Sequence, residues 1–171
     1  MGGTGRRVLV GVMGGGECAP EVERLAFDLG RAIAGKGWAL LNGGRAAGVM
    51  DASARGARAA GGLVVGVLPD RDLARMSPYV DIPIRTGMGD ARNAINVLSS
   101  DVVVALPGAA GTLSEIALAV RDAKPLVLVG WDLDDLTREH ERRGLLARAA
   151  TADEAVAAVE RFLKRGLGSG V

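Results

Sequence analysis

Short runs in which nearly every residue is apolar recur along this sequence, and each is followed by a turn and a segment with helical periodicity. A strand that is apolar throughout, rather than at alternate positions, is buried on both faces. Such strands belong to parallel sheets, whose connections return across the sheet as helices. The pattern therefore predicts an α/β fold. We expect a single doubly wound, mostly parallel sheet with helices on both faces, which is a Rossmann-like three-layer sandwich.

The expected elements follow from this alternation. Strands are predicted over residues 7–13, 38–41, 63–68, 80–84, 101–106, 126–129 and 145–149. Helices are predicted over residues 20–36, 48–60, 90–100 and 112–123, and a capping box at 151–154 opens a terminal helix through Lys164. The polar stretch 132–143 is left unassigned. We expect one domain over residues 1–165, followed by a flexible tail over residues 166–171.

Composition and charge exclude several classes of partner. Hydrophobic residues make up 49% of the chain and charged residues 24%, as in an ordinary globular protein. The net charge of +1 provides no general field for nucleic acid, and no apolar run is long enough to span a membrane. The N-terminus lacks the order of a signal peptide, and the single cysteine, Cys18, fits a reducing compartment. We therefore expect a cytoplasmic protein that has neither nucleic acid nor membrane as a partner. One Cys and one His cannot form a structural zinc site, so no metal site is expected.

Three glycine clusters follow predicted strands, and they mark the predicted binding site. In a parallel sheet all such turns lie at the carboxyl edge, where ligands bind. A glycine turn that leads into a helix exposes backbone N–H groups and the positive end of the helix dipole, which suits a phosphate group. The sequence therefore predicts a site for a phosphorylated small molecule. Its predicted residues are Gly14, Gly15 and Gly16, then Asn42, Gly43, Gly44, Arg45 and Gly48, and finally Pro107, Gly108, Ala109, Gly111 and Thr112.

Several common cofactor sites are excluded. The NAD fingerprint needs G-x-G-x-x-G and an acidic residue at the end of the second strand, whereas residues 11–16 read G-x-x-G-G-G and Asn42 ends that strand. A Walker A loop needs G-K-[ST], which the sequence lacks. A pyridoxal-phosphate lysine decarboxylase needs a Schiff-base lysine. Lys36, Lys124 and Lys164 all fall away from the glycine turns.

Two side-chain assignments near these turns stay open at this point. Thr112 and Glu115 have the spacing of a capping box, in which the glutamate reaches back to the start of its own helix. The preceding glycine turn favours ligand contact instead, with Thr112 donating to a phosphate. The two roles compete, because a glutamate held in a capping box is not free to approach a ligand. Arg45 either reaches a phosphate with two hydrogen bonds or is an exposed loop arginine. Asp90 is the nearest second carboxylate along the sequence.

Residues 107–115 resemble the Pro-Gly-Gly-x-Gly-Thr-x-x-Glu signature of the Lonely Guy phosphoribohydrolases and of their relatives, the molybdenum-cofactor carrier proteins. The resemblance extends over residues 8–129, and residues 42–50 are similar to the Gly-Gly-x-x-x-Gly-x-Met loop of this superfamily. It implies that Arg92 and Glu115 act together as catalytic residues, with Met88 and Asn93 in the ligand site. In a hydrolase, Arg92 would hold the substrate while Glu115 stabilises an oxocarbenium-like transition state or orients water.

Two residues depart from the hydrolase signature. Asn93 stands where the hydrolases have lysine, and residues 92–101 look more like the carrier branch. Ala109 replaces the second glycine, and its methyl group is expected to obstruct a close approach to phosphate or to force a different φ.

The resemblance implies binding or carrying of a phosphorylated nucleotide or pterin, such as the molybdenum cofactor, as cargo. The alternative is a phosphoribohydrolase that cleaves the N-glycosidic bond of nucleoside 5′-monophosphates. No further cofactor is required in either case. The resemblance also implies a homo-oligomer, either a dimer or a tetramer.

Overall fold

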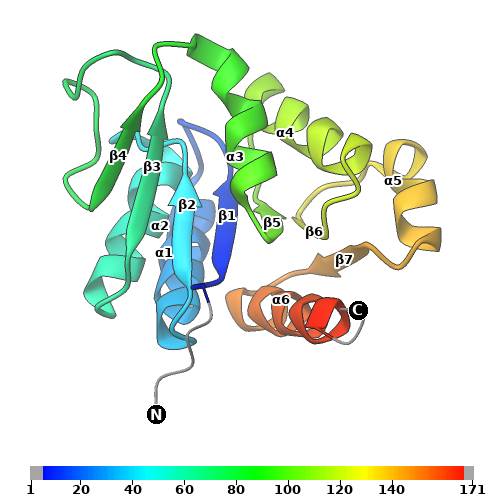
Figure 1. Ribbon diagram of the computed structural model, residues 1–171. Coiled ribbons are helices and arrows are strands. Elements are labelled where there is room, and N and C mark those ends of the chain that lie inside the picture. Colours follow the sequence, from blue (N-terminus) through cyan, green and yellow to red (C-terminus); the bar gives the residue numbers. More distant parts are fainter. Residues whose placement is uncertain (1–5, 168–171) are drawn as a thin grey trace.

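The computed structural model describes residues 6–167, which contain one sheet of seven parallel strands (Figure 1). The strand order is β4-β3-β2-β1-β5-β6-β7. Every neighbouring pair is parallel, so the predicted doubly wound α/β fold is confirmed. The strands are β1 (Leu9–Met13), β2 (Ala39–Asn42), β3 (Val64–Leu68), β4 (Ile82–Arg85), β5 (Val102–Ala105), β6 (Leu126–Val129) and β7 (Leu146–Ala149).

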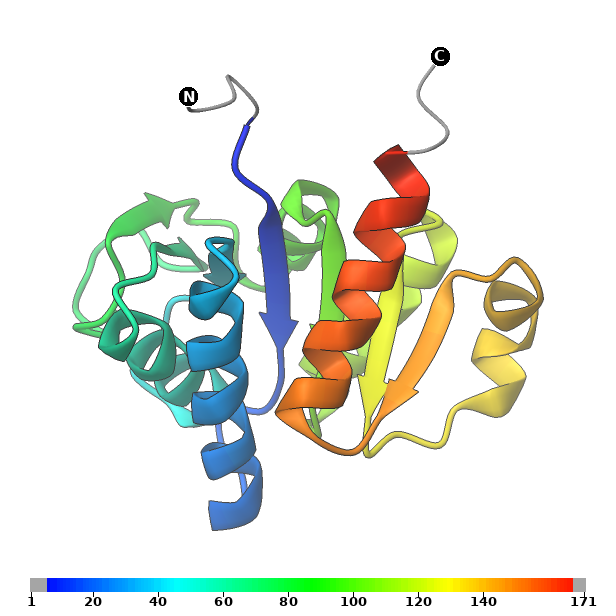
Figure 2. The ribbon, with the colours of Figure 1, turned by 90° about the horizontal axis from the view of Figure 1, so that it is seen from below.

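Helices lie on both faces of the sheet, as Figures 1 and 2 show. One layer contains α1 (Pro20–Gly35), α2 (Gly48–Ala59) and α6 (Ala152–Leu167). The other contains the 3₁₀ turn η1 (Gly89–Arg92) with α3 (Asn93–Ser99), α4 (Ala110–Arg121) and α5 (Asp134–Arg142). Each face of the strands buries its own apolar cluster against one of these layers. Burial on both faces explains why the strand sequences are apolar throughout.

Three elements differ from the sequence-based expectation. The unassigned stretch contains helix α5, and the predicted helix over 90–100 is divided into η1 and α3. Helix α6 continues through Leu167, three residues beyond the predicted end at Lys164; residues 168–171 of the predicted tail lie outside the described residues. Lys164 and Arg165 stand in the last turn of α6, where positive charge interacts favourably with the helix dipole.

The capping box that opens α6 is confirmed, with one variation. The Thr151 hydroxyl accepts a hydrogen bond from the Glu154 amide at 3.2 Å. The Glu154 carboxylate accepts one from the amide of Ala150, at 2.8 Å, rather than from that of Thr151. The reciprocal pairing of side chain and backbone therefore begins this helix as the sequence predicts.

Strand β1 marks the point where the strand order reverses. It pairs with β2 on one side and with β5 on the other. The connections that leave β1 and β5 therefore diverge to opposite faces of the sheet, which opens a crevice at the carboxyl edge between them.

Helices α1 and α2 approach each other backbone to backbone. An ideal Cβ atom at Gly56 of α2 would lie 1.9 Å from the carbonyl oxygen of Phe27, and one at Gly30 of α1 would lie 2.0 Å from that of Ser53. No side chain fits at either position. These two helices follow the first two glycine turns, so their close packing also sets where the turns lie.

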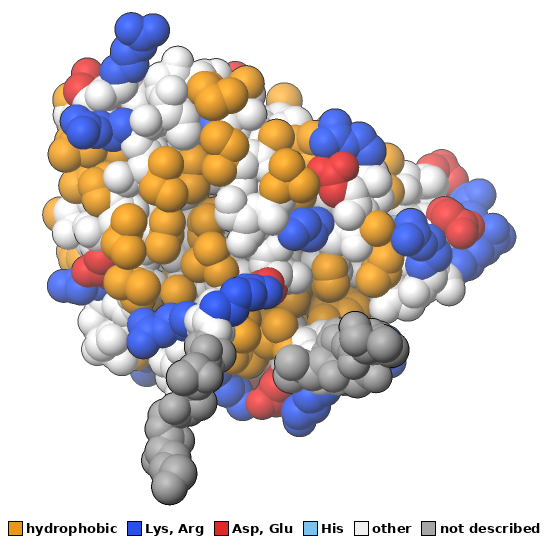
Figure 3. Space-filling model, in the orientation of Figure 1, with side chains coloured by type: hydrophobic (Ala, Val, Ile, Leu, Met, Phe, Trp, Pro, Cys, Tyr) orange, Lys and Arg blue, Asp and Glu red, His pale blue; other side chains and the backbone are white. Residues whose placement is uncertain are grey.

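Part of one sheet face is covered by none of the helices in residues 6–167. The connection from β3 to β4, residues 69–81, contains no helix. Ile82 and Ile84 of β4 are register partners of Val65 and Val67 and share their face of the sheet. Their exposed fractions are 46% and 42%. Figure 3 shows hydrophobic side chains gathered on this side of the molecule.

Within the described residues, no helix combines the length and the hydropathy needed to cross a bilayer.

Candidate functional site

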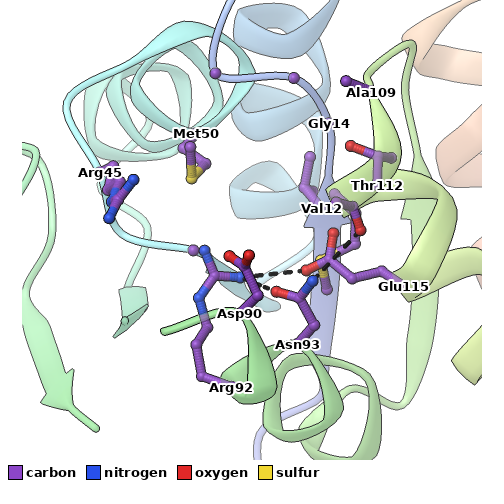
Figure 4. Close-up of a pocket in the computed structure, with 15 residues that line it drawn as sticks. Val12, Gly14, Arg45, Met50, Asp90, Arg92, Asn93, Ala109, Thr112 and Glu115 are labelled. Carbon is purple, nitrogen blue, oxygen red and sulfur yellow. Dashed lines mark hydrogen bonds and ion pairs between the residues drawn. The ribbon is translucent and has the colours of Figure 1, made fainter. Parts of the chain in front are cut away.

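A cavity of about 240 Å³ opens at the carboxyl edge of the sheet, next to the reversal point at β1 (Figure 4). The predicted site residues that line it are Gly14, Gly15, Gly16, Gly43, Arg45, Arg92, Asn93, Ala109, Gly111, Thr112 and Glu115. They come from all three glycine clusters together with η1, α3 and α4. The expected convergence of the three turns on one site is what the structure shows.

Backbone contacts hold the three turns together. The amide of Gly15 donates to the carbonyl of Pro107 at 3.1 Å, and the carbonyl of Gly15 accepts from the amide of Val49 at 2.9 Å. Gly108 of the third turn is packed between the first turn and helix α4, because a Cβ atom there would lie 2.8 Å from the Gly15 nitrogen and 2.2 Å from the Thr112 hydroxyl. The turn after β1 is thus anchored to both of the others.

Other predicted site residues shape these turns rather than line the cavity. The Asn42 side chain donates to the carbonyl of Met50 at 2.8 Å and accepts from the amide of Gly44 at 2.8 Å, which closes the second loop. Pro107 contributes its carbonyl to Gly15. Gly44, Gly48, Met88 and Gly108 also lie outside the cavity lining, and Met88 is exposed.

Four cavity residues were not among the predicted site residues: Val12, Met13, Met50 and Asp90. Met50 belongs to the second loop pattern and Asp90 was noted as a nearby carboxylate, so both carried a signal in the sequence. Val12 and Met13 carried none, because they read as ordinary strand residues. Within the described chain, no group of three or more His, Cys, Asp or Glu side chains is arranged to hold a metal ion.

Helix α4 begins two residues earlier than predicted, and this resolves the roles of Thr112 and Glu115. Its N-cap is Ala109, which makes no side-chain cap, so Thr112 and Glu115 both lie inside the helix. The capping-box interpretation is therefore wrong. Ala109 has φ of −106° and ψ of −157°, an extended conformation open to any residue, so replacing glycine causes no backbone strain. The first-turn amides of α4 border the cavity without a side-chain acceptor from the N-cap.

Arg92 and Glu115, 23 residues apart in the sequence, meet in this cavity. The Arg92 Nη1 atom lies 3.4 Å from the Glu115 Oε1 atom and donates to the Asn93 side-chain oxygen at 2.6 Å (Figure 4). The exposed fractions are 9% for Arg92 and 5% for Glu115. Gly43 permits the close approach of the guanidinium, since a Cβ atom there would lie 2.6 Å from Nη2. The predicted encounter of these two side chains is confirmed.

Two arginine nitrogens near the cavity have no hydrogen-bond partner. They are the Nε atoms of Arg45 and Arg92, both buried and unpaired within the described residues. Arg45 is held by Asp70, with Nη2 lying 3.4 Å from each carboxylate oxygen. Both arginines line the cavity, so their guanidinium groups suit a ligand that supplies acceptor oxygens.

Burial dominates the electrostatics of Glu115. It raises the pKa of this carboxyl from 4.5 to about 7, while the Asn96 hydrogen bond and the Arg92 charge lower it and the Asp90 charge raises it. Burial likewise lowers the pKa of Arg92, against the charge of Glu115. A carboxyl that titrates near neutral pH in a cavity is suited to proton transfer or to recognition of a donor group.

The Glu115→Gln variant is expected to remove a pH dependence of stability. Between pH 4.5 and 7 the folded protein holds a proton on Glu115 that the unfolded chain does not, so the free energy of unfolding falls as the pH rises through this window. The shift corresponds to roughly 3 kcal/mol at most. Urea unfolding at several pH values should show the wild type losing this amount relative to the variant. Parallel pH profiles for the two proteins would contradict the raised pKa.

Comparisons with known proteins agree with the geometry. Residues 7–156 match the model of the SLOG cluster4 family. The molybdenum cofactor binding protein of Rippkaea orientalis superposes with a TM-score of 0.87 at 40% identity, over 92% of this chain and 98% of that one. The molybdenum cofactor carrier protein of Chlamydomonas reinhardtii gives a TM-score of 0.84 at 44% identity, over 93% and 99%.

A similarity to an enzyme covers less of the chain. The cytokinin riboside 5′-monophosphate phosphoribohydrolase of Mycobacterium tuberculosis is 40% identical over 119 residues, which is 64% of this chain and 63% of that one. The family match, the two structures and the hydrolase all agree with the resemblance carried by residues 107–115. The chain therefore belongs to the SLOG cluster4 family of the Lonely Guy superfamily.

Proposed function

We propose that the protein binds or carries a phosphorylated small molecule, either a nucleotide or a pterin such as the molybdenum cofactor, in the cavity at the carboxyl edge. The observation that carries this proposal is the combination of the open N-terminus of α4 with the guanidinium groups of Arg45 and Arg92, since both arginines line the cavity. Helix amides and arginines are the two groups that proteins use most often to bind phosphate oxygens.

The rest of the cavity suits the remainder of such a molecule. Val12, Met13 and Met50 add apolar surface beside the polar groups. A volume of about 240 Å³ is below the roughly 300–1,000 Å³ of typical ligand pockets, so part of a nucleotide or pterin would extend outside. The full-length match to two proteins described as binding or carrying the molybdenum cofactor supports the carrier form of the proposal.

Thermal unfolding with AMP, GMP and isolated molybdenum cofactor tests the proposal, with adenosine and guanosine as matched controls. A compound at 100 times its Kd stabilises the fold by about 2.7 kcal/mol. For a chain of this length, the melting temperature should rise by roughly 5–10 °C. Only the phosphorylated compounds are expected to have this effect. Equal shifts with the nucleosides, or no shift with any phosphorylated compound, would contradict phosphate recognition.

A second function, hydrolysis of nucleoside 5′-monophosphates, is favoured by the buried pair of Arg92 and Glu115. A glutamate beside the bound sugar could stabilise an oxocarbenium-like transition state or orient the attacking water. Incubation with AMP or GMP followed by chromatography detects free base. Base release that is lost in Glu115→Gln would establish catalysis and reject a protein that only carries its ligand. The absence of free base would leave binding as the function.

We propose further that the chain forms a homo-oligomer through the uncovered sheet face that contains Ile82 and Ile84. An apolar patch is complementary to itself, which is what a two-fold contact between identical subunits requires. The double variant Ile82→Lys/Ile84→Lys places like charges opposite each other in such a contact. Sedimentation should show an assembly for the wild type and a monomer for the variant. An unchanged assembly in the variant would place the contact elsewhere.

A further inference from the structure

Asn96 of α3 lies behind the cavity and contacts its central carboxylate. The side chain is completely buried, with an exposed fraction of 0%. Its Nδ2 atom donates to Oε1 of Glu115 at 2.8 Å, which is shorter than the 3.4 Å between Oε1 and Nη1 of Arg92. Asn96 is not among the residues that line the cavity. It therefore acts on Glu115 from the protein interior, not on a ligand directly.

The two oxygens of Glu115 have different surroundings. The donors Asn96 and Arg92 both bond Oε1. No residue that the structure describes donates a hydrogen bond to Oε2. Figure 4 shows the carboxylate extending into the cavity, with Arg92 and Asn93 on one side and Thr112 on the other. Oε2 is therefore the oxygen available to a donor on a bound molecule or to a water.

Asn96 has one hydrogen bond that fixes its backbone and one side-chain oxygen that residues 6–167 leave unpaired. Its backbone carbonyl accepts the Ser100 hydroxyl at 2.7 Å, which fixes the C-terminal turn of α3. Its side-chain oxygen is buried and has no partner within the described residues. An unpaired buried oxygen destabilises the folded state, so the amide is not the most stable side chain for packing alone. The bond to Glu115 is the interaction that an apolar side chain of the same size would lack.

We propose that Asn96 is a positioning residue, whose amide fixes Oε1 of Glu115 and leaves Oε2 facing the bound molecule. This inference rests on the proposed function, because only a ligand in this cavity gives Oε2 a role. The charged groups that face Glu115 are Arg92 and Asp90, both from η1, and Asn96 supplies the polar contact from α3. The amide hydrogen bond favours the ionised carboxylate and so opposes the effect of burial on its pKa.

Titration of the Glu115 carboxyl by ¹³C NMR tests this role without any ligand. In Asn96→Leu the pKa should rise by about one pH unit, because a hydrogen bond to a charged group is lost. Asn96→Ala, which cannot overfill the site, should show the same rise if the leucine variant does not fold. The control is Thr137→Ala, which removes the hydrogen bond that the buried Thr137 hydroxyl of α5 donates to the Leu133 carbonyl, away from Asn96 and Glu115. The control should leave the pKa unchanged.

The pH dependence of AMP binding separates this inference from the proposed function. In Asn96→Leu the pH at which AMP affinity changes should move upward together with the Glu115 pKa. An unchanged pKa in both Asn96 variants, or an equal rise in Thr137→Ala, would overturn the positioning role. If the Glu115 pKa rises in the Asn96 variants but the wild type binds no phosphorylated compound, the positioning role of Asn96 is supported and the proposed function is contradicted.

Discussion

Replacing Arg92 with alanine should lower the affinity for a phosphorylated ligand by about 30-fold or more. The side chain is buried and lines the cavity, where its Nη1 atom contacts Asn93 and Glu115. Truncating one member of a buried, hydrogen-bonded charge pair costs about 2–5 kcal/mol, and 2 kcal/mol corresponds to a factor of about 30. The loss also removes the nearest positive charge from Glu115, which disfavours its ionised form. Calorimetric titration with AMP or the molybdenum cofactor measures the change.

The matched control for this variant is Arg85→Ala. Arg85 belongs to β4, is exposed and does not line the cavity, so the same change in net charge should leave the affinity within a factor of two or so. A comparable loss in both variants would mean that general charge, rather than the buried guanidinium, determines binding. An unchanged affinity in Arg92→Ala would place the anion at another part of the cavity.

A large loss of stability that does not depend on pH is expected for Gly56→Ala. Alanine gains about 1 kcal/mol over glycine in helix propensity. That gain is outweighed, because the new Cβ atom would lie 1.9 Å from the backbone oxygen of Phe27 and the two helices would have to separate. Overpacking of this kind typically costs 1–3 kcal/mol, and a clash with backbone belongs at or above the upper end of that range. We expect a net loss of about 2 kcal/mol and a melting temperature lower by roughly 4–8 °C.

Gly35→Ala provides the comparison within the same helix pair. Gly35 ends α1, and nothing lies within 4 Å of the position where its Cβ atom would stand. This variant should be neutral or slightly more stable than the wild type. If Gly56→Ala were as stable as Gly35→Ala, the backbone contact between α1 and α2 would be looser than the structure shows. Because both helices follow glycine turns of the cavity, ligand affinity should fall along with stability in Gly56→Ala.

Local patterns in the sequence were sufficient for the sheet. The apolar run at residues 101–106 predicted β5. The observed strand, Val102–Ala105, begins one residue later and ends one residue earlier than predicted. Burial on both faces leaves a signature at every residue of a strand, so these segments can be identified without any partner. The helix α5 was missed, because the two side chains that it buries, Thr137 and His140, are polar, so no apolar stripe marks its buried face.

The roles inside the site depended on contacts that no local pattern contains. Thr112 and Glu115 fit a capping box by spacing, yet α4 begins at Ala110 and both residues lie inside the helix. The difference of two residues in the helix start decides whether Glu115 bonds its own backbone or faces Arg92. Helix starts depend on the turn before them, and here that turn is fixed by the bond between Gly15 and Pro107, which join distant parts of the chain.

The sequence by itself determined the parallel α/β fold, the edge at which the glycine turns meet and the two charged residues at the centre of the site. The fold and the edge follow from periodicity and strand direction, which are local, whereas the two charged residues follow from the resemblance of residues 92–115 to the Lonely Guy superfamily. Only the tertiary structure decided that Asn96 holds Glu115, that Gly30 and Gly56 must lack side chains, and that Glu115 titrates near neutral pH. Each of these depends on burial and on distances between residues far apart in the chain, and such quantities exist only once the helices have packed on the sheet.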